Sequence, residues 1–440
     1  MLDSRTFLIY TLGCKVNQYE SEAIAEELIR RGASRAEGDV ADIYIINTCT
    51  VTAESDRKSG QIIRRLRSIN PKAAILVTGC FSQISPKRAM SIEGVDYVCG
   101  SANKMSVADE AERILSEGKR AFPTLHLPNL ESVPFESIPI SSFRRTRAYI
   151  KIEDGCNNHC SYCIIPKARG PVRSRDSEEI ISEIIRLSDA GCPEIVLTGI
   201  ETEAYGVDFK NGYRLAELIE DICNRTAISR IRLGSVSPAL FTQSFVDRIC
   251  TLPQMLPHYH ISLQSGCSRT LADMKRRYNA DQASAALSRI RAARPDVQFS
   301  ADLIVGFPGE SEEDIGETLS FLEKERFLSL HVFPYSMRAG TPAAQRADQI
   351  EKSEKKARSE RVSTQQERIK QDILSSYVGK EVSVLFEETV THEGKEYLCG
   401  HTPFFAQTCV SSESHHLKGA LISATVRFVN DGILFADEIV

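Results

Sequence analysis

The sequence predicts an α/β protein made of three successive units. Residues 1 to about 120 and about 143 to 372 alternate short apolar strands with amphipathic helices, which is typical of parallel sheets covered by helices. From residue 377 to 440 the hydrophobic pattern changes to short strands of period two. With 440 residues, the chain is long enough for two or three domains.

The first unit, residues 1–120, is predicted to be an open parallel sheet of the Rossmann- or flavodoxin-like kind. Its strands are TFLIYTLGC, IYIINTC, AAILVTGC and VDYVCG, and three of them end in a cysteine, at Cys14, Cys49 and Cys80. The carboxyl ends of parallel strands lie along one edge of a sheet, so these thiols are expected to converge there. We call them the N-terminal triad and predict a metal site; the alternative is three structural cysteines.

The second unit follows a linker predicted over residues 121–142, which hold four prolines and no helical period. Six strand–helix units then predict a partial (β/α)6 barrel over residues 143–372. The expected strands are AYIKIEDGC, EIVLTGIE, RIRLGSVSP, HYHISLQSG, FSADLIVGFPGE and LSLHVFPYS. In such barrels the site lies at the carboxyl ends of the strands. The charged helix expected over 351–372 is predicted to be a solvated face.

The third unit, residues 377–440, is predicted to be a small β-barrel. The segments EVSVLFEETV, TCVSS, LISATVRFV and GILFADEIV are short strands, and HEGKEY and NDG are turn signals between strands. The two phenylalanines of GHTPFF are expected to fill this barrel rather than to stack bases.

Composition points to metal or redox chemistry in a globular protein. The net charge of −5 gives no global sign of nucleic-acid binding. No apolar run approaches the ~18 residues of a membrane span, and no leader is recognisable, so we expect a cytoplasmic protein without a membrane segment. Thirteen cysteines are many for such a chain. Seven are expected to be isolated small core residues: Cys99, Cys192, Cys223, Cys250, Cys267, Cys399 and Cys409.

A second group of three cysteines lies in DGCNNHCSYCIIP, directly after the first strand of the predicted barrel. Cys156, Cys160 and Cys163, which we call the loop triad, have the spacing C-x3-C-x2-C. A cuboidal iron–sulfur cluster normally has four thiolate ligands, so three leave one iron open to a small molecule. Zinc is the alternative, but it would require a fourth ligand such as His159, whose place between two cysteines would strain the loop.

The loop triad, with Tyr162 as the aromatic residue, resembles the cysteine motif of radical S-adenosylmethionine enzymes. The resemblance implies that the open iron chelates S-adenosyl-L-methionine, whose cleavage yields a 5′-deoxyadenosyl radical. LTGIE and DLIVGFPGE resemble the cofactor loops of that superfamily, although each alone could be a simple βα turn. The cofactor-binding residues implied in this way are Tyr162, Thr198, Gly199, Glu201, Gly306 and Phe307.

The N-terminal motifs TLGCKVNQYESE, NTCTVTAESDRKS and VTGC resemble the methylthiotransferases, which replace C–H by C–SCH3. GCNNHCSYCIIPKARGPVRSR and LQSGCSRTLADMKRRY fit the same family, and the third unit resembles its TRAM domain, an OB-like barrel. The resemblance implies a second, auxiliary 4Fe-4S cluster on the N-terminal triad. The implied partners are tRNA, a sulfur donor, and a low-potential electron donor such as flavodoxin or ferredoxin.

Two motifs suggest which branch of the methylthiotransferase family the chain resembles. TLGCKVNQYES and LTGIETEAYGVD look most like the threonylcarbamoyladenosine tRNA methylthiotransferases. The implied product is 2-methylthio-N6-threonylcarbamoyladenosine at position 37, next to the anticodon. Alternatives are isopentenyladenosine in tRNA, an aspartate of a ribosomal protein, or, in another class, a non-catalytic iron–sulfur protein that binds RNA. Arg173, Arg175 and Arg232 lie near strand ends and are candidates for the threonyl carboxylate, although a surface salt bridge is the more usual role for a single arginine.

Three basic groups are candidates for contacts with phosphates, although each could equally be a solvated surface. They are Arg64, Arg65 and Arg67; Arg144, Arg145 and Arg147; and Lys275, Arg276 and Arg277.

Overall fold

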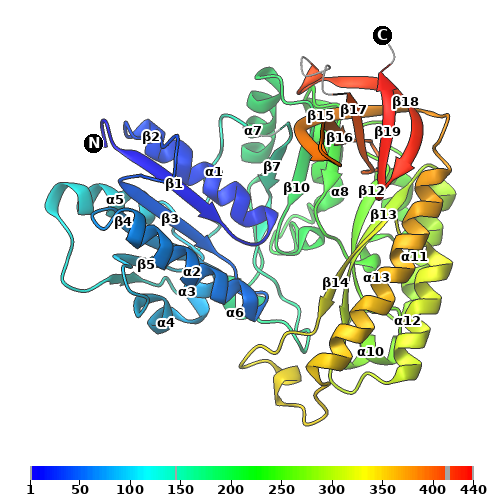
Figure 1. The fold of residues 1–440 in the computed structure, drawn as a ribbon, viewed down its shortest axis with the longest axis horizontal. Helices are drawn as coiled ribbons and strands as arrows, with labels where there is room; N and C mark the ends of the chain where they lie inside the picture. Colours follow the sequence, from blue (N-terminus) through cyan, green and yellow to red (C-terminus); the bar gives the residue numbers. More distant parts are fainter. Residues whose placement is uncertain (1, 144–145, 412–416, 439–440) are drawn as a thin grey trace.

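The computed structural model describes residues 2–143, 146–411 and 417–438 and shows the three expected units (Figure 1). The predicted fold class, an α/β protein with a C-terminal β-barrel, is confirmed. None of the helices in the described part of the chain is long and apolar enough to cross a bilayer.

The N-terminal unit is a six-stranded parallel sheet in the order β2-β1-β3-β4-β5-β6. Its strands are β1 Thr6–Thr11, β2 Ser34–Arg35, β3 Ile43–Thr48, β4 Ala74–Gly79, β5 Tyr97–Cys99 and β6 Thr124–His126. Its helices are α1 Lys15–Arg30, α2 Ala53–Ile69, α3 Cys80–Ile84, α4 Pro86–Met90 and α5 Ser106–Glu117. Strands β3 and β4 are entirely buried, which explains their unbroken apolar sequences.

Strand β6 lies inside the segment predicted to be a linker. It pairs with β5 through Tyr97 and Thr124, Val98 and Leu125, and Cys99 and His126. Only three residues long and flanked by coil, this edge strand is too short to show a hydrophobic period. The first sheet therefore extends further along the chain than the sequence pattern indicates.

The central unit holds six parallel strands in two groups, β11-β10-β7 and β12-β13-β14. A parallel bridge between Val236 and Ile261 joins the groups into one curved sheet. The strands are β7 Ala148–Lys151, β10 Ile195–Thr198, β11 Ile231–Leu233, β12 His258–Gln264, β13 Gln298–Val305 and β14 Ser329–Pro334. We call this unit the central barrel.

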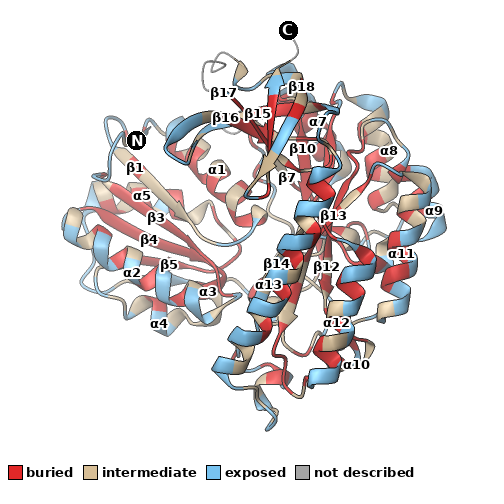
Figure 2. Cartoon of the chain, turned by 45° about the vertical axis from the view of Figure 1, so that its right-hand side comes forward, coloured by how far each residue is buried: buried red, intermediate tan, exposed pale blue. Residues whose placement is uncertain are grey.

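Helices cover the outer face of the central barrel. They are α7 Ser177–Asp189, α8 Leu215–Arg225, α11 Ala280–Ala293, α12 Glu312–Glu325 and α13 Lys352–Ser375, with short α9 Gln243–Phe245 and α10 Ser268–Asp273 between them. Figure 2 shows buried strands flanked by helices whose outward faces are exposed. Helix α13 differs from the expected solvated face, because Val362, Ile369 and Ile373 are buried and it packs along β14.

The C-terminal unit is a small β-barrel, as predicted, and it closes with five strands in the order β15-β16-β17-β19-β18, of which β16 was not among the four expected segments. Its strands are β15 Glu381–His392, β16 Lys395–His401, β17 Gln407–Ser411, β18 Leu421–Asn430 and β19 Ile433–Glu438. Cys399 and Cys409 were expected to be isolated, and this was wrong: they face each other across β16 and β17 and form a disulfide.

The GHTPFF segment joins the C-terminal unit to the central barrel. Phe404 stacks on Tyr377 and helps to fill the small barrel, as expected. Phe405 instead lies between the rings of His258 and His401, with centroid distances of 4.9 Å and 4.5 Å. One of the two phenylalanines therefore belongs to the contact between units.

Candidate active site

The loop triad begins where the first barrel strand ends. Strand β7 is followed by β8 Glu153–Asp154, a sharp turn at Gly155 with φ +96°, and the cysteine loop. A Cβ at Gly155 would overlap the carbonyl oxygen of Pro171, so only glycine fits this turn. The N–H of Cys156 donates to the carbonyl of Gly170 at 3.0 Å. The segment from Cys156 to Gly170 is therefore a closed loop, and it contains helix α6 Ile165–Arg169.

Two thiols of the loop triad contact polar side chains. Cys156 donates to Glu201 at 2.9 Å, and Arg276 donates to the sulfur of Cys160 at 3.4 Å. Burial, and then the charge of Glu201, raises the pKa of the Cys156 thiol. Burial likewise raises the pKa of Cys163 to about 11. Cys156 and Cys163 are therefore protonated without a metal, and a metal bound there would displace their protons.

The N-terminal triad lies at the carboxyl edge of three neighbouring strands. Cys14 follows β1, Cys49 follows β3, and Cys80 follows β4 as the first residue of α3. A Cβ at Gly13 would lie 2.7 Å from the Cβ of Cys49, so the turns after β1 and β3 touch. Burial, followed by the neighbouring Cys80 and then Cys14, raises the pKa of Cys49 to about 11. The structure thus brings the three thiols together, as the sequence predicts.

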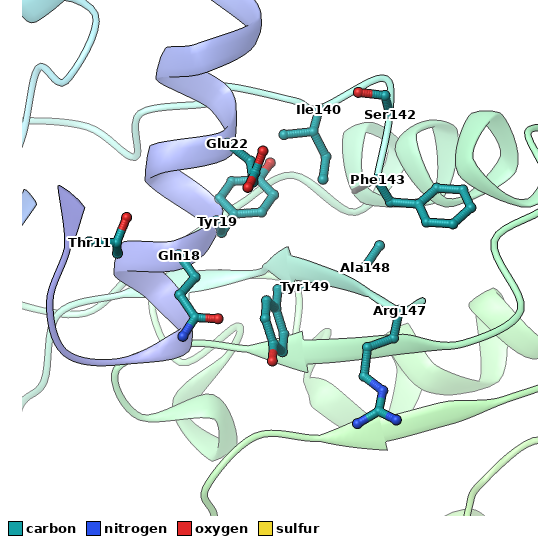
Figure 3. A pocket seen from close by; sticks show the side chains of 10 residues that line it. All are labelled: Thr11, Gln18, Tyr19, Glu22, Ile140, Ser142, Phe143, Arg147, Ala148 and Tyr149. Carbon is teal, nitrogen blue, oxygen red and sulfur yellow. The ribbon is translucent and has the colours of Figure 1, made fainter. Parts of the chain in front are cut away.

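Cys14 precedes the first residue of α1, the helix that packs against β7 of the central barrel. Its residue surface is open to solvent, yet the surrounding protein raises the pKa of its thiol, first by desolvation. Figure 3 shows a pocket between α1 and β7, lined among others by Gln18, Arg147 and Tyr149. This pocket therefore lies between the N-terminal unit and the central barrel.

Buried charges next to Cys80 test whether an anionic metal cluster fits the N-terminal triad. Arg169 donates to the sulfur of Cys80 at 3.2 Å and belongs to a buried network of four cations and two carboxylates. Its members are Lys104, Lys151, Arg169, Arg173, Glu20 and Asp154. Although burial alone would raise it, the cations hold the pKa of Glu20 well below its usual range. Two positive charges are thus left over, and three thiolates around an iron–sulfur cluster supply the negative charge that balances them.

The expected cofactor loop after β10 lies against the loop triad. Thr198 is the buried last residue of β10, and a Cβ at Gly199 would overlap the carboxylate of Glu153. The N–H of Glu201 donates to the same carboxylate at 2.8 Å, while the Glu201 side chain accepts from Cys156. Burial raises the pKa of Glu153 well above its usual range, and its carboxyl holds the loop by accepting the N–H of Glu201.

The other expected cofactor residues lie in or beside an apolar cluster that includes the cysteine loop. Tyr162, from the cysteine loop, packs in one apolar cluster with Phe307 and Tyr335. Gly306, at φ +68°, turns the chain after β13, and its N–H donates to Glu310 at 2.7 Å. The structure therefore places aromatic side chains from the cysteine loop and from the GFPGE segment side by side.

The three arginines suggested for substrate binding make contacts within the protein, and one of them, Arg175, also lies 3.5 Å from the half-exposed carboxylate of Glu179. Arg175 is buried and donates to Tyr19 and Glu183. Arg173 donates to the carbonyls of Leu130 and Arg169, at 3.2 Å and 2.8 Å. Arg232 pairs with Glu194 at 2.7 Å and donates to the carbonyls of Thr402 and Pro403. Their donors stabilise contacts within and between units.

The basic groups suggested for phosphate contacts are also partly used inside the protein. Arg147 is buried beside Glu194 and Glu387, and Arg276 is turned inward to Cys160. Arg67 pairs with Asp96 at 2.8 Å. Arg144 and Arg145 lie outside the described residues.

Sequence reasoning missed the polar side chains that support the two triads. Glu153, Arg169 and Arg276 are the main examples. Arg169 lies six residues after Cys163 and Glu153 three residues before Cys156, so proximity to the cysteine motif is the only signal the sequence offers for them. Arg276 is more than 110 residues from its sulfur partner, and nothing local marks it.

Comparison with known proteins agrees with this arrangement. Residues 150–322 match the Radical SAM superfamily, and residues 6–100 match the Uncharacterized protein family UPF0004. The threonylcarbamoyladenosine tRNA methylthiotransferase MtaB of Bacillus subtilis (strain 168) is 39% identical over 395 residues, 89% of this chain and 87% of the relative. The MtaB of Aquifex aeolicus (strain VF5) is 34% identical over 86% of this chain and 92% of the relative.

A third relative carries a different name. A tRNA-2-methylthio-N(6)-dimethylallyladenosine synthase of Clavibacter michiganensis subsp. michiganensis (strain NCPPB 382) is 35% identical over 89% of this chain and 74% of the relative. Among solved structures, the radical S-adenosylmethionine methyltransferase TsrM from Kitasatospora setae has a TM-score of 0.56 at 16% identity, covering 78% of this chain and 77% of TsrM. The likeness to TsrM concerns the fold alone. Given the identity and coverage of the relatives, the chain belongs to the radical S-adenosylmethionine family of tRNA methylthiotransferases, 4Fe-4S enzymes that use S-adenosylmethionine.

Proposed function

We propose that this enzyme converts N6-threonylcarbamoyladenosine next to the tRNA anticodon to its 2-methylthio derivative. The observation that carries the reaction type is the proximity of the two triads: the buried Arg169 ends the loop that holds one triad and donates to Cys80 of the other. Relatives named for this substrate, at 34% and 39% identity over most of the chain, support the choice of nucleoside.

In this proposal the loop triad and the N-terminal triad are the ligands of two separate clusters. With S-adenosylmethionine, a 4Fe-4S cluster held by the loop triad would supply a 5′-deoxyadenosyl radical able to attack an unactivated C–H bond. The cluster held by the N-terminal triad would present the sulfur, and a second S-adenosylmethionine would supply the methyl group. In this proposal the two clusters face each other across the contact between neighbouring units, because each triad follows the carboxyl ends of strands in its own unit.

The residues around the loop triad position the cofactor in this proposal. Tyr162 and Phe307 offer an apolar wall, and Thr198, Gly199 and Glu201 form the polar edge of the β10 loop. Glu153 fixes that loop by accepting the N–H of Glu201. The close approach at Gly199 and the turn at Gly306 leave backbone groups near the site without an intervening Cβ.

Lys15 is the cation we propose for the threonyl carboxylate. It follows Cys14 directly, and its amino group makes no hydrogen bond or ion pair within the described part of the chain. Burial, then the charges of Arg232 and Arg147, lowers its pKa, while Asp302 acts in the opposite direction. An unpaired ammonium group close to the charges of Arg232 and Arg147 favours an anionic ligand over a neutral isopentenyl group.

Replacing Lys15 tests this assignment. We expect Lys15→Met to raise KM for tRNA bearing threonylcarbamoyladenosine about tenfold, equivalent to about 1.4 kcal/mol, and Lys15→Arg to restore much of it. Deoxyadenosine formation from S-adenosylmethionine without tRNA serves as the control. An unchanged KM in Lys15→Met would exclude this residue.

The proposed reaction is tested with anaerobically reconstituted enzyme, dithionite, S-adenosylmethionine and two purified tRNAs. One carries threonylcarbamoyladenosine and the other dimethylallyladenosine. Conversion of the first to its methylthio form supports the proposal. Conversion of the second alone would place the enzyme with the Clavibacter relative, conversion of neither would turn attention to a ribosomal protein, and bound but uncleaved S-adenosylmethionine would point to a non-catalytic RNA-binding protein.

A further inference from the structure

Arg169 is the residue through which one triad reaches the other. It is the last residue of α6, six positions after Cys163, and its side chain is fully buried. Its Nε donates to the sulfur of Cys80 at 3.2 Å, in the N-terminal unit. Its Nη2 donates to the side-chain oxygen of Asn17, which is in the first turn of α1, three residues after Cys14. One guanidinium thus contacts the turns that carry two members of the N-terminal triad.

The guanidinium is held in place on its remaining side. Its Nη1 donates to Glu20 at 2.6 Å and lies 3.3 Å from Asp154. Glu20 is also paired with Lys104 at 3.2 Å and Lys151 at 2.8 Å. The planar fork of arginine suits three acceptors in fixed directions, which the single ammonium of lysine could not satisfy together.

The backbone around Arg169 is fixed as well. Gly170, at φ +74°, accepts the N–H of Cys156 at 3.0 Å, so the loop that carries the loop triad closes at this point. The carbonyl of Ala168 accepts the hydroxyl of Ser101 at 2.5 Å, which adds a bond to the N-terminal unit. A displacement of the cysteine loop would therefore move the Arg169 side chain away from Cys80.

We propose that Arg169 is a positioning residue that donates to the Cys80 ligand, keeps the reduction potential of the auxiliary cluster high, and ties that cluster to the loop triad. The physical reason is that an N–H donor and a positive charge beside a ligand thiolate stabilise the more negative, reduced state of a cluster. This inference rests on the proposed assignment of Cys14, Cys49 and Cys80 as cluster ligands.

The test measures a potential rather than activity. In full-length protein carrying Cys156→Ala, Cys160→Ala and Cys163→Ala, only the auxiliary cluster remains, and its midpoint is followed by redox titration with electron paramagnetic resonance. We expect Arg169→Met to shift the midpoint to a more negative value. Glu20→Gln, which removes an anion paired with Arg169, should shift it to a more positive value.

Two further variants separate this role from a merely structural one. Arg175→Met removes another fully buried arginine that joins the central barrel to α1, through Tyr19, but Arg175 makes no contact with a sulfur. It should therefore lower stability and leave the midpoint unchanged. Arg169→Lys keeps the positive charge and should give a midpoint between those of the parent and of Arg169→Met. If Arg169→Met does not fold, Arg169→Lys and Glu20→Gln still test the inference.

The failures of the two proposals are distinguishable. If the parent protein with three alanines holds about four irons and its midpoint does not respond to changes at Arg169 and Glu20, the inference about Arg169 is overturned while the cluster assignment stands. If that parent holds no iron, the assignment of the N-terminal triad fails, and the inference falls with it.

Discussion

Glu203, in the loop after β10, shows what burial does to a single side chain near the loop triad. Burial raises its pKa to about 7, although the N–H of Ser237 donates to its carboxylate and acts in the opposite direction. In the unfolded chain the carboxyl titrates near the ordinary value of about 4.5. The folded state therefore binds this proton more tightly than the unfolded state does.

The sign of the resulting pH dependence follows from that difference. The contribution of the proton to stability is complete below the unfolded pKa and disappears as the pH rises through about 7. We expect Glu203→Gln to unfold like the wild type at about pH 4, below the unfolded pKa, and to be more stable at about pH 8, by about 2 kcal/mol after allowance for the side chain's partial exposure. Scanning calorimetry at both pH values measures this, and an equal difference at both would contradict it.

Single residues also show what sequence reasoning could not supply. The cysteines of both triads were predictable because their spacing and their position after apolar strands are local features. Arg276 was expected on a basic surface, yet it is partly buried and donates to the sulfur of Cys160, since its partner is brought near only by the closing of the barrel. Charge alone does not show which way a long side chain turns.

At the scale of elements, α13 holds the GFPGE segment in place. Arg358 donates to the carboxylate of Glu310 at 2.7 Å, and that carboxylate accepts the N–H of Gly306. Both side chains of the pair are almost fully buried. Because α13 packs along β14, this pair fixes the GFPGE segment after β13 to a helix more than 40 residues further along the chain.

Breaking this pair should weaken cofactor binding as well as folding. Loss of one partner of a buried ion pair costs about 3–5 kcal/mol, so we expect Arg358→Met to lower Tm and to raise Kd for S-adenosylmethionine. The matched control is Arg361→Met on the same helix, whose partner Glu312 is exposed and whose pair contributes about 0–1 kcal/mol. Equal effects of the two variants, by thermal unfolding and equilibrium dialysis, would argue against this role for α13.

Helices and long strands were predictable because their signals are local. Thr52 and Ser311 cap α2 and α12 with their side chains, which is a local signal of where a helix begins. Strand β6 was not predictable, because a three-residue edge strand carries no period of its own. The pairing of Cys399 with Cys409 depends on the register of β16 against β17, which the sequence alone does not determine.

At the scale of the whole molecule, buried contacts join the three units to one another. Arg169 connects the central barrel to Cys80, and Arg232 connects it to the carbonyls of the GHTPFF segment. The topology of each unit follows from hydrophobic periodicity, but these contacts join residues 89 and 170 positions apart. They explain why the sequence predicted both triads but not the polar network that supports them.

Iron content tests whether the molecule holds two independent clusters. We expect about eight irons per chain in anaerobically reconstituted protein, and about half of that when Cys14, Cys49 and Cys80 are replaced by Ala. The triple variant should still form deoxyadenosine from S-adenosylmethionine, since the loop triad is intact. Loss of all iron from it would contradict two separate sites.

The most direct test of the proposed function is mass spectrometry of tRNA nucleosides from cells that lack this gene and then regain it. The account predicts that the methylthio form of threonylcarbamoyladenosine disappears, returns with the wild-type gene, and does not return with Cys156→Ala. An unchanged level of that nucleoside in the cells lacking the gene would contradict it.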